Sequence, residues 1–280
     1  MRPRQLLVKI LTSTVVFFHS NRENGMKIVA VIPAHMASVR FPGKILFMLN
    51  GLPMIEHVRR RALMSKSLAE VIVATCDESI ASVIRGFGGR VIMTANTHKN
   101  GTSRVAEAIS ELDDCTHVIL LQGDEPLLLP RHIDTLADAI LANPNGDAWN
   151  ATGPIEAYEE LDRHSFVKCA VSQSGRIMHC FRRTPSHSSF EKQLGFVRKI
   201  LGIIAFRKDF LMKITSMPST QVELAEFIEQ MRILENDYSL QSVPVDPSVP
   251  SVNEPNEVDV VLEYMHQNLE QKALLEKILD

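Results

Sequence analysis

Residues 27–44 read K-I-V-A-V-I-P-A-H-M-A-S-V-R-F-P-G-K, and this stretch decides the fold. Residues 28–32 are an apolar run, which stops at Pro33 and continues as a small-residue loop carrying Arg40 and Lys44. Buried parallel strands are typically such runs, and their carboxyl ends meet at the crevice in which open α/β sheets bind ligands. Two cations at that edge indicate a polyphosphate, and therefore a nucleotide. An ordinary strand followed by two solvated cations is an equally good interpretation of this segment alone.

Strands and helices alternate from residue 26 onward, as βαβ units require. Apolar runs predict strands at 28–32, 71–74, 90–93 and 118–121. Amphipathic stretches predict helices at 54–65, 77–87, 103–112 and 130–143. The second half predicts strands at 166–171, 177–181 and 201–206, a long acidic helix at 223–234 and a final helix at 256–279. We expect the first four strands to be parallel and residues 26–280 to form one domain whose second half binds the substrate.

Composition narrows the class of partner. The 280 residues are 45% apolar and 22% charged with a formal net charge of −3, and no basic patch stands out, so we expect no nucleic-acid partner. The four cysteines are widely spaced, at Cys76, Cys115, Cys169 and Cys180. Because they form no C-x-x-C pair, neither a zinc site nor a disulfide framework is indicated, and reduced thiols in a cytoplasmic protein fit best.

Residues 1–25 differ from the rest of the chain. Their apolar stretch is interrupted by Lys9, is too short to span a bilayer and is followed by no small-residue cleavage site. We therefore expect no membrane association and interpret 1–25 as a dispensable extension, so that a truncation beginning at Met26 should fold.

Two carboxylates, Asp124 and Glu125, lie just beyond the apolar strand at 118–121. Neither is expected to be buried without a partner, and a hard divalent cation is the natural one. Mg²⁺ is usually held by one or two carboxylates together with substrate phosphates. The alternative is a turn or helix-capping acid ahead of Pro126.

A third polar loop, H-K-N-G-T-S-R at residues 98–104, precedes a predicted helix, so its amides and hydroxyls could face a ligand. Taken alone it is an ordinary capped helix start. The three polar loops follow strands predicted to be parallel and should therefore converge on one crevice. This convergence indicates a ligand site more specifically than any one loop does.

Five motifs together resemble the 3-deoxy-manno-octulosonate cytidylyltransferases, also called CMP-Kdo synthetases. They are P-A-H-M-A-S-V-R-F-P-G-K at 33–44, H-K-N-G-T-S-R-V-A-E at 98–107, L-Q-G-D-E-P at 121–126, L-G-I at 201–203 and E-L-A-E-F-I-E-Q-M-R-I-L-E at 223–235. The resemblance runs through the chain from Met26 onward, in the same order and at similar spacing.

The resemblance implies a Rossmann-like nucleotidyltransferase fold: a mixed, mostly parallel sheet flanked by helices, with a small sugar-binding and dimerisation subdomain. It implies a homodimer that transfers CMP from CTP to the anomeric hydroxyl of a 3-deoxy-ulosonic acid and releases pyrophosphate. By motif position the catalytic residues are Arg40 and Lys44, which hold the triphosphate, and Asp124, which binds Mg²⁺. The nucleotide-binding positions also include Pro33, Ala34, His35, Ser38, Asn100, Gly101 and Arg104, and the sugar-binding positions are Gln122, Glu229 and Gln230.

The mechanism expected from the resemblance follows from charge. Cations and Mg²⁺ that neutralise the phosphoryl oxygens and organise an in-line displacement supply most of the catalysis, and no covalent enzyme nucleophile is needed.

The metal and phosphate positions depart from the family pattern at two places. Asn253 replaces the aspartate that is the second protein ligand to Mg²⁺, and its amide oxygen can coordinate the ion without adding charge. His35 replaces an arginine and weakens one phosphate contact.

The sugar half departs further. Ile200 and Ile204 replace a histidine and a tyrosine, Ser103 replaces an acid, and Arg182 is added beside another arginine. A pocket that lacks these hydrogen-bonding groups leaves sugar hydroxyls unpaired, so we expect it to discriminate against the sugar that the family usually binds. A cytidylyltransferase for another sugar acid, or a nucleotide-binding homologue with reduced or no turnover, therefore remain alternatives. Lys168 lies in an alternating strand and is expected to face the solvent at least as readily as the substrate.

Overall fold

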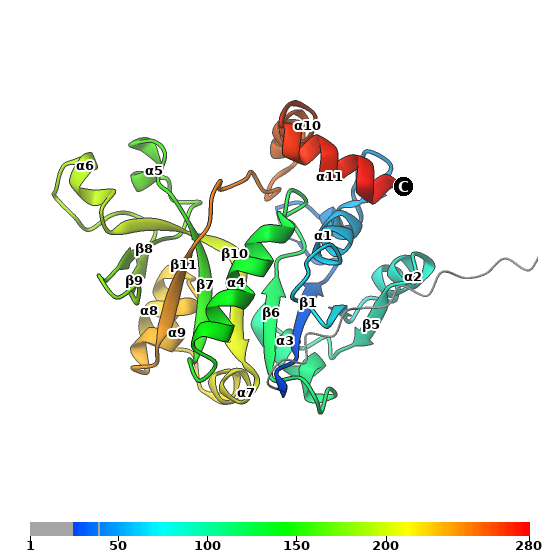
Figure 1. The fold of residues 1–280 in the computed structure, drawn as a ribbon, viewed down its shortest axis with the longest axis horizontal. Coiled ribbons are helices and arrows are strands. Elements are labelled where there is room, and N and C mark those ends of the chain that lie inside the picture. The colour runs from blue at the N-terminus through cyan, green and yellow to red at the C-terminus, as the bar shows by residue number, and fades with distance from the viewer. Residues whose placement is uncertain (1–24, 39) are drawn as a thin grey trace, which may run out of the picture.

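The structure is a computed structural model that describes residues 25–38 and 40–280. Within them, nine strands form one sheet in the order β11-β7-β10-β6-β1-β4-β5, and β8 and β9 extend it from β10 (Figure 1). The strands are β1 Ile28–Ala34, β4 Glu70–Thr75, β5 Arg90–Met93, β6 His117–Leu121, β7 Ala148–Gly153, β8 Lys168–Val171, β9 Ile177–Phe181, β10 Val197–Arg207 and β11 Leu240–Pro244. A separate hairpin pairs β2 Met48–Leu49 with β3 Leu52–Pro53.

The four predicted strands of the first half are parallel, because β1 pairs in parallel with β4 and β6, and β4 pairs in parallel with β5. Strand β10 runs antiparallel to both β6 and β7, which makes the sheet mixed. The predicted α/β class with a mixed, mostly parallel sheet is confirmed.

Helices cover both faces of the sheet (Figure 1). They are α1 Met54–Ala62, α2 Glu78–Gly86, α3 Gly101–Ser110, α4 Pro130–Ala142, α5 Glu159–Asp162, α6 Phe190–Gln193, α7 Lys208–Ser216, α8 Gln221–Glu226, α9 Gln230–Glu235, α10 Val258–Gln267 and α11 Leu269–Leu279. Along β1, Ala30 and Ile32 pack with α1, α2 and α4, whereas Val29 and Val31 pack with α3, α7 and α9. Both faces of the strand are buried, which explains its continuous apolar run.

Two smaller units flank this core. Helices α10 and α11 share a hydrophobic cluster with residues of α1 and the β2–β3 hairpin, including Leu49 and Met54. On the other side, Leu161 of α5, Phe181 of β9 and Val197 of β10 form a cluster under the lobe that carries α5 and α6. The two units therefore lie on either side of the sheet edge between them.

The predicted helix at 223–234 is wrong as one continuous element. Helix α8 ends at Glu226, and α9 begins at Gln230 after a break at Phe227, whose φ is 54°. A left-handed residue cannot continue a right-handed helix. The side chain of Ile228 beside the break is 1% exposed, so burial of that residue favours the change of direction.

The predicted helix at 256–279 is also divided. Residues 255–257 form a short 3₁₀ turn, and α10 and α11 are separated at Asn268, whose side chain accepts a hydrogen bond from the backbone N–H of Gln271. This is an N-cap interaction, which starts a new helix.

Lys168 does not face the solvent as the alternation of its strand indicated. It is fully buried, and its Nζ donates to the carbonyl of Arg163 at 2.9 Å and to the carbonyl of Arg182. Desolvation lowers its pKa to about 8. Two carbonyl partners at the strand end satisfy the ammonium and allow the burial.

The expectation of a dispensable extension concerns residues 1–25, of which 1–24 lie outside the described residues. Across 25–38 and 40–280, no helix combines the length and the apolar character needed to cross a bilayer.

Candidate functional site

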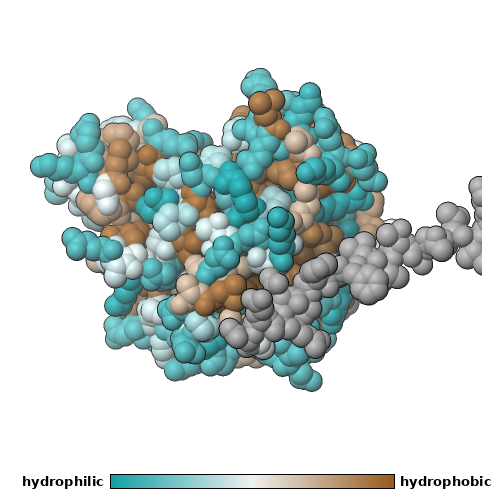
Figure 2. All heavy atoms as spheres, in the orientation of Figure 1, coloured by the Kyte–Doolittle hydropathy of each residue, from teal (hydrophilic) through white to brown (hydrophobic). Residues whose placement is uncertain are grey.

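A pocket of about 780 Å³ lies at the carboxyl end of β6, where the chain leaves the sheet at Gln122. It is walled by β10, by the start of α9 and by the segment 248–254. Figure 2 shows the molecule hollowed between the lobe with α5 and α6 and the lobe with α10 and α11. This is the crevice at which a parallel sheet binds its ligand.

The cationic loop after β1 lines this pocket with Arg40 and contacts its wall with Lys44. Lys44 follows Gly43, which adopts a left-handed φ of 73°, and its Nζ lies 2.5 Å from Oδ2 of Asp124 and 3.3 Å from the carbonyl of Val252. Arg40 lines the pocket, and its Nη2 donates to Oδ1 of Asn253 at 3.4 Å. The loop is thereby attached to both predicted metal-binding residues.

The acidic loop after β6 holds Asp124 and Glu125 in different environments. The backbone N–H of Val252 donates to the carbonyl of Asp124 at 3.1 Å, which joins the loop to the segment that carries Asn253. The Glu125 carboxyl lies against Gly202, where a Cβ would be 2.6 Å from Oε1. Burial, and next the charge of Asp124, raise the pKa of Glu125 to about 8. The Glu125 carboxyl is therefore largely neutral at pH 7.

The loop before α3 contributes a hydroxyl to the pocket and caps its helix. The side chain of Asn100 accepts from the backbone N–H of Ser103 at 2.9 Å, and Thr102 lines the pocket. Arg104 is buried behind the loop, where its Nη1 donates to Oγ1 of Thr94 at 2.6 Å. Gly101 lies against the end of β1, since a Cβ there would be 2.9 Å from the ring of Pro33.

The predicted sugar-binding residues face the same pocket from two sides. Gln122, Glu229 and Gln230 all line it. Oε2 of Glu229 accepts from Oγ1 of Thr102 at 2.6 Å, and Nε2 of Gln230 donates to Oδ1 of Asn150 at 3.1 Å. The Glu229 side chain is open to solvent at the mouth of the pocket, yet desolvation around its carboxylate raises its pKa.

Six of the predicted site residues therefore meet in one pocket wall. They are Arg40, Gln122, Asp124, Glu229, Gln230 and Asn253. Lys44 contacts this wall through Asp124, and Ala34, His35 and Ser38 belong to the end of β1 and the loop that leads to Arg40. Ala34 is buried in the core, whereas His35 is exposed.

Two contacts made by the predicted site residues are not predicted from the sequence. Thr102 links the α3 loop to Glu229, and the buried Asn150 of β7 holds Gln230 while its Nδ2 donates to the carbonyl of Leu201 at 3.0 Å. A polar asparagine inside the run A-W-N-A-T-G at 148–153 is the signal that could have indicated the second contact.

An oxygen-rich wall, a cationic loop and a mixed, mostly parallel sheet define the class of protein, an α/β nucleotidyltransferase. The model of the cytidylyltransferase family matches residues 29–241. The chain is 36% identical over 249 residues to the 3-deoxy-manno-octulosonate cytidylyltransferase of Geobacter sulfurreducens, which covers 85% of this chain and 99% of the relative. It is 33% identical over 245 residues to that of Protochlamydia amoebophila, covering 85% and 94%.

Solved structures support the same family assignment. A CMP:2-keto-3-deoxy-manno-octonic acid synthetase complexed with CTP has a TM-score of 0.81 and 35% identity, and the match covers 87% of this chain and all (100%) of that one. A cytidylyltransferase of Leptospira borgpetersenii, at 17% identity and a TM-score of 0.61 over 90% of this chain and 94% of its own, shares the fold. The chain belongs to the 3-deoxy-manno-octulosonate cytidylyltransferase family.

Proposed function

We propose that the protein transfers CMP from CTP to the anomeric hydroxyl of a 3-deoxy-ulosonic acid, 3-deoxy-manno-octulosonate or a close analogue, and releases pyrophosphate. The observation that carries the proposal is the junction of three segments at one pocket: Lys44 contacts Asp124 and the carbonyl of Val252, and Arg40 contacts Asn253. A polyanionic nucleotide needs that concentration of positive charge, and the named relatives support CTP as the nucleotide.

The donor set of the pocket fits a magnesium ion. Asp124 supplies one carboxylate, whose side chain is 21% exposed, and Asn253 supplies an amide oxygen in the same wall. Among the described residues, no three His, Cys, Asp or Glu side chains gather as a metal cage. One carboxylate, one amide oxygen and substrate phosphates match the preference of Mg²⁺ for hard oxygens with few protein ligands. When bound, the ion supplies positive charge to the phosphoryl oxygens.

The chain's own residues then position the reaction. Arg40 and Lys44 bind the triphosphate and offset the negative charge of its oxygens. Gln122, Glu229 and Gln230 orient the sugar acid from the other side of the pocket. The anomeric oxygen bonds to the α-phosphorus as the bond from that phosphorus to the pyrophosphate oxygen breaks, and the hydroxyl proton leaves to solvent. Orientation and charge therefore supply most of the catalysis.

Two further features of the proposal concern the setting of the enzyme. We propose a cytoplasmic homodimer, which the family resemblance supports. The four cysteines are free thiols, as expected in a reducing compartment. Analytical ultracentrifugation tests the dimer, and a single monomeric species over the concentration range of the assay would contradict it.

A different sugar acid is the second candidate substrate. Ile200 and Ile204 line the pocket, and Gln230 and Glu229 supply polar contacts on one side only. A wall with this aliphatic area favours an acid with fewer hydroxyls on that side, since buried hydroxyls without partners are costly.

Pyrophosphate release tests the proposal. The protein is incubated with Mg²⁺, each of the four nucleoside triphosphates and a panel of sugar acids that includes 3-deoxy-manno-octulosonate. We expect release only with CTP and a 3-deoxy-ulosonic acid. Calorimetric CTP binding without release for any acid, and without rescue by Asn253→Asp, would instead indicate a nucleotide-binding protein that has lost turnover.

A further inference from the structure

Phe227 is the most anomalous residue at the mouth of the pocket. Its side chain is 82% exposed, it lines the pocket, and its backbone has a φ of 54° and a ψ of 48°. Exposure of a phenylalanine loses hydrophobic stabilisation, and a left-handed backbone is unfavourable for a bulky side chain. Such conformations persist when the surrounding structure holds them, and they gather at ligand sites.

The surrounding structure does hold this residue. Arg182, at the end of β9, donates from Nη2 to the carbonyl of Phe227 at 3.1 Å, from Nε to the carbonyl of Glu226 at 2.8 Å and from Nη1 to the carbonyl of His164 at 2.9 Å. On the other side, Ile228 is inserted into the core. The break between α8 and α9 is therefore a fixed turn that directs the Phe227 ring outward.

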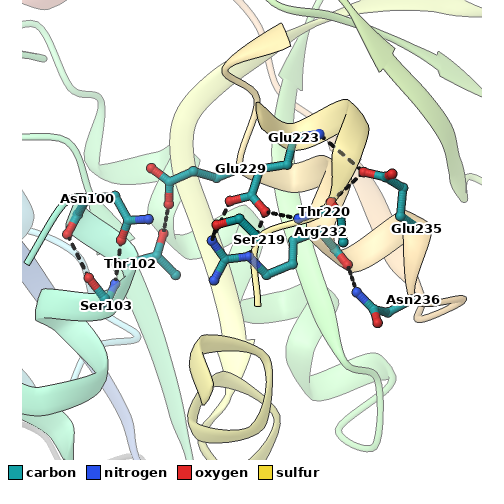
Figure 3. Close-up of polar contacts among 10 residues, drawn as sticks. All are labelled: Asn100, Thr102, Ser103, Ser219, Thr220, Glu223, Glu229, Arg232, Glu235 and Asn236. Atoms are coloured by element: carbon teal, nitrogen blue, oxygen red, sulfur yellow. Dashed lines mark hydrogen bonds and ion pairs between the residues drawn. The ribbon is translucent and has the colours of Figure 1, made fainter. Parts of the chain in front are cut away.

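The same turn places the polar residues that follow it. Figure 3 shows Glu229 extending from the segment before α9 to Thr102 at the start of α3, while Arg232 pairs with Glu223 beside it. Phe227 thus lies two residues before Glu229, whose carboxylate is proposed to bind the sugar acid. The aromatic ring and the carboxylate belong to one rigid unit at one pocket.

We propose that Phe227 is a substrate-binding residue that packs its ring against the C–H face of the bound sugar acid. The inference rests on the proposed function and deepens it. The face of an aromatic ring carries partial negative charge and attracts the partially positive C–H groups of a sugar, while its area excludes water. Arg182, which also lines the pocket, is the positioning residue, because its three donors all go to backbone carbonyls, two of them in the turn.

The direct test replaces the ring and keeps the turn. Glycine adopts positive φ without strain, so Phe227→Gly should fold with an unchanged or higher Tm. We expect its KM for 3-deoxy-manno-octulosonate to rise about tenfold, with the KM for CTP within about twofold of the unaltered protein. Phe227→Tyr, which keeps the ring, should restore the KM. Leu224→Ala is the matched control, because Leu224 is 60% exposed on α8 and does not line the pocket.

A second variant reports binding without turnover. In Phe227→Trp, 3-deoxy-manno-octulosonate should change the emission of the introduced indole, after subtraction of the signal from the buried Trp149 measured in the unaltered protein. Arg182→Gln should raise the KM for the sugar acid and leave that for CTP unchanged, with partial rescue in Arg182→Lys.

The outcomes separate the two proposals. Failure of the unaltered protein to release pyrophosphate counts against the proposed function, whereas an unchanged KM in Phe227→Gly or an unresponsive Phe227→Trp emission overturns the inference. Dissociation of a dimer in Phe227→Gly, with the KM restored at high protein concentration, would assign the ring to a subunit contact and also overturn it.

Discussion

Removal of the Lys44 ammonium is the most informative single change in the pocket. Lys44→Met keeps the length and apolar part of the side chain and removes the charge that lies 2.5 Å from Oδ2 of Asp124. The side chains of this pair are only 11% and 21% exposed, so solvent replaces the lost charge poorly. We expect a large loss of turnover with the fold intact.

The magnitude follows from the position of the charge. A cation about 4 Å from a phosphoryl oxygen contributes on the order of 4 kcal/mol at an effective dielectric constant of about 20. Loss of one such transition-state contact typically reduces kcat by about 10²–10³-fold. The folded state loses one charge-assisted hydrogen bond, about 1.5–3 kcal/mol, which lowers Tm by several degrees.

The assay is steady-state pyrophosphate release at saturating CTP and sugar acid, with thermal unfolding measured in parallel. Lys27→Met is the matched control, because Lys27 forms an ion pair with Asp114 at 2.8 Å and does not line the pocket. Its turnover should stay within about twofold of the unaltered protein. Turnover of Lys44→Met within tenfold of the unaltered protein, at full occupancy of both substrates, would refute the role of the Lys44 charge.

Three further predictions concern the metal, the Glu125 carboxyl and the link between loops. Asn253→Asp should lower the Mg²⁺ concentration for half-maximal turnover, and tighten Mn²⁺ binding measured by EPR, by about tenfold; equal affinities would exclude Asn253 from the metal site. Glu125, with a pKa raised to about 8 in the folded protein, binds more protons than the unfolded chain between about pH 4.5 and 8, so its stabilising contribution is lost across that window as pH rises. The Tm advantage of Glu125→Gln should therefore grow from pH 5 to pH 8, and a constant difference would contradict the raised pKa. Thr102→Val removes the hydrogen bond to Glu229 and should raise the KM for the sugar acid several-fold while the KM for CTP stays unchanged; equal effects on both would show a general loss of the pocket.

The elements predicted best are those whose local pattern and burial agree. The strand at 28–34 is continuous and apolar because both of its faces lie in hydrophobic clusters, and α4 begins at Pro130, a residue that favours the first turn of a helix. Arg40, Lys44 and Asp124 could be proposed as neighbours because loops after parallel strands share one edge of the sheet.

The features missed depend on contacts between distant parts of the chain. The break at Phe227 is held by Arg182, which lies 45 residues earlier, so the local pattern of 223–234 indicates one helix. Lys168 is buried because two carbonyls outside its strand accept from it. The link between Thr102 and Glu229 joins residues 127 positions apart, and no pattern in the sequence around either residue indicates it.

Transfer of a cytidylyl group at this pocket can be observed by ³¹P NMR of a reaction containing CTP, Mg²⁺ and 3-deoxy-manno-octulosonate. We predict that a new phosphodiester resonance and pyrophosphate appear in equal amounts, and that neither appears with Asp124→Asn. Release of orthophosphate with formation of CDP, or equal product formation by Asp124→Asn, would contradict it.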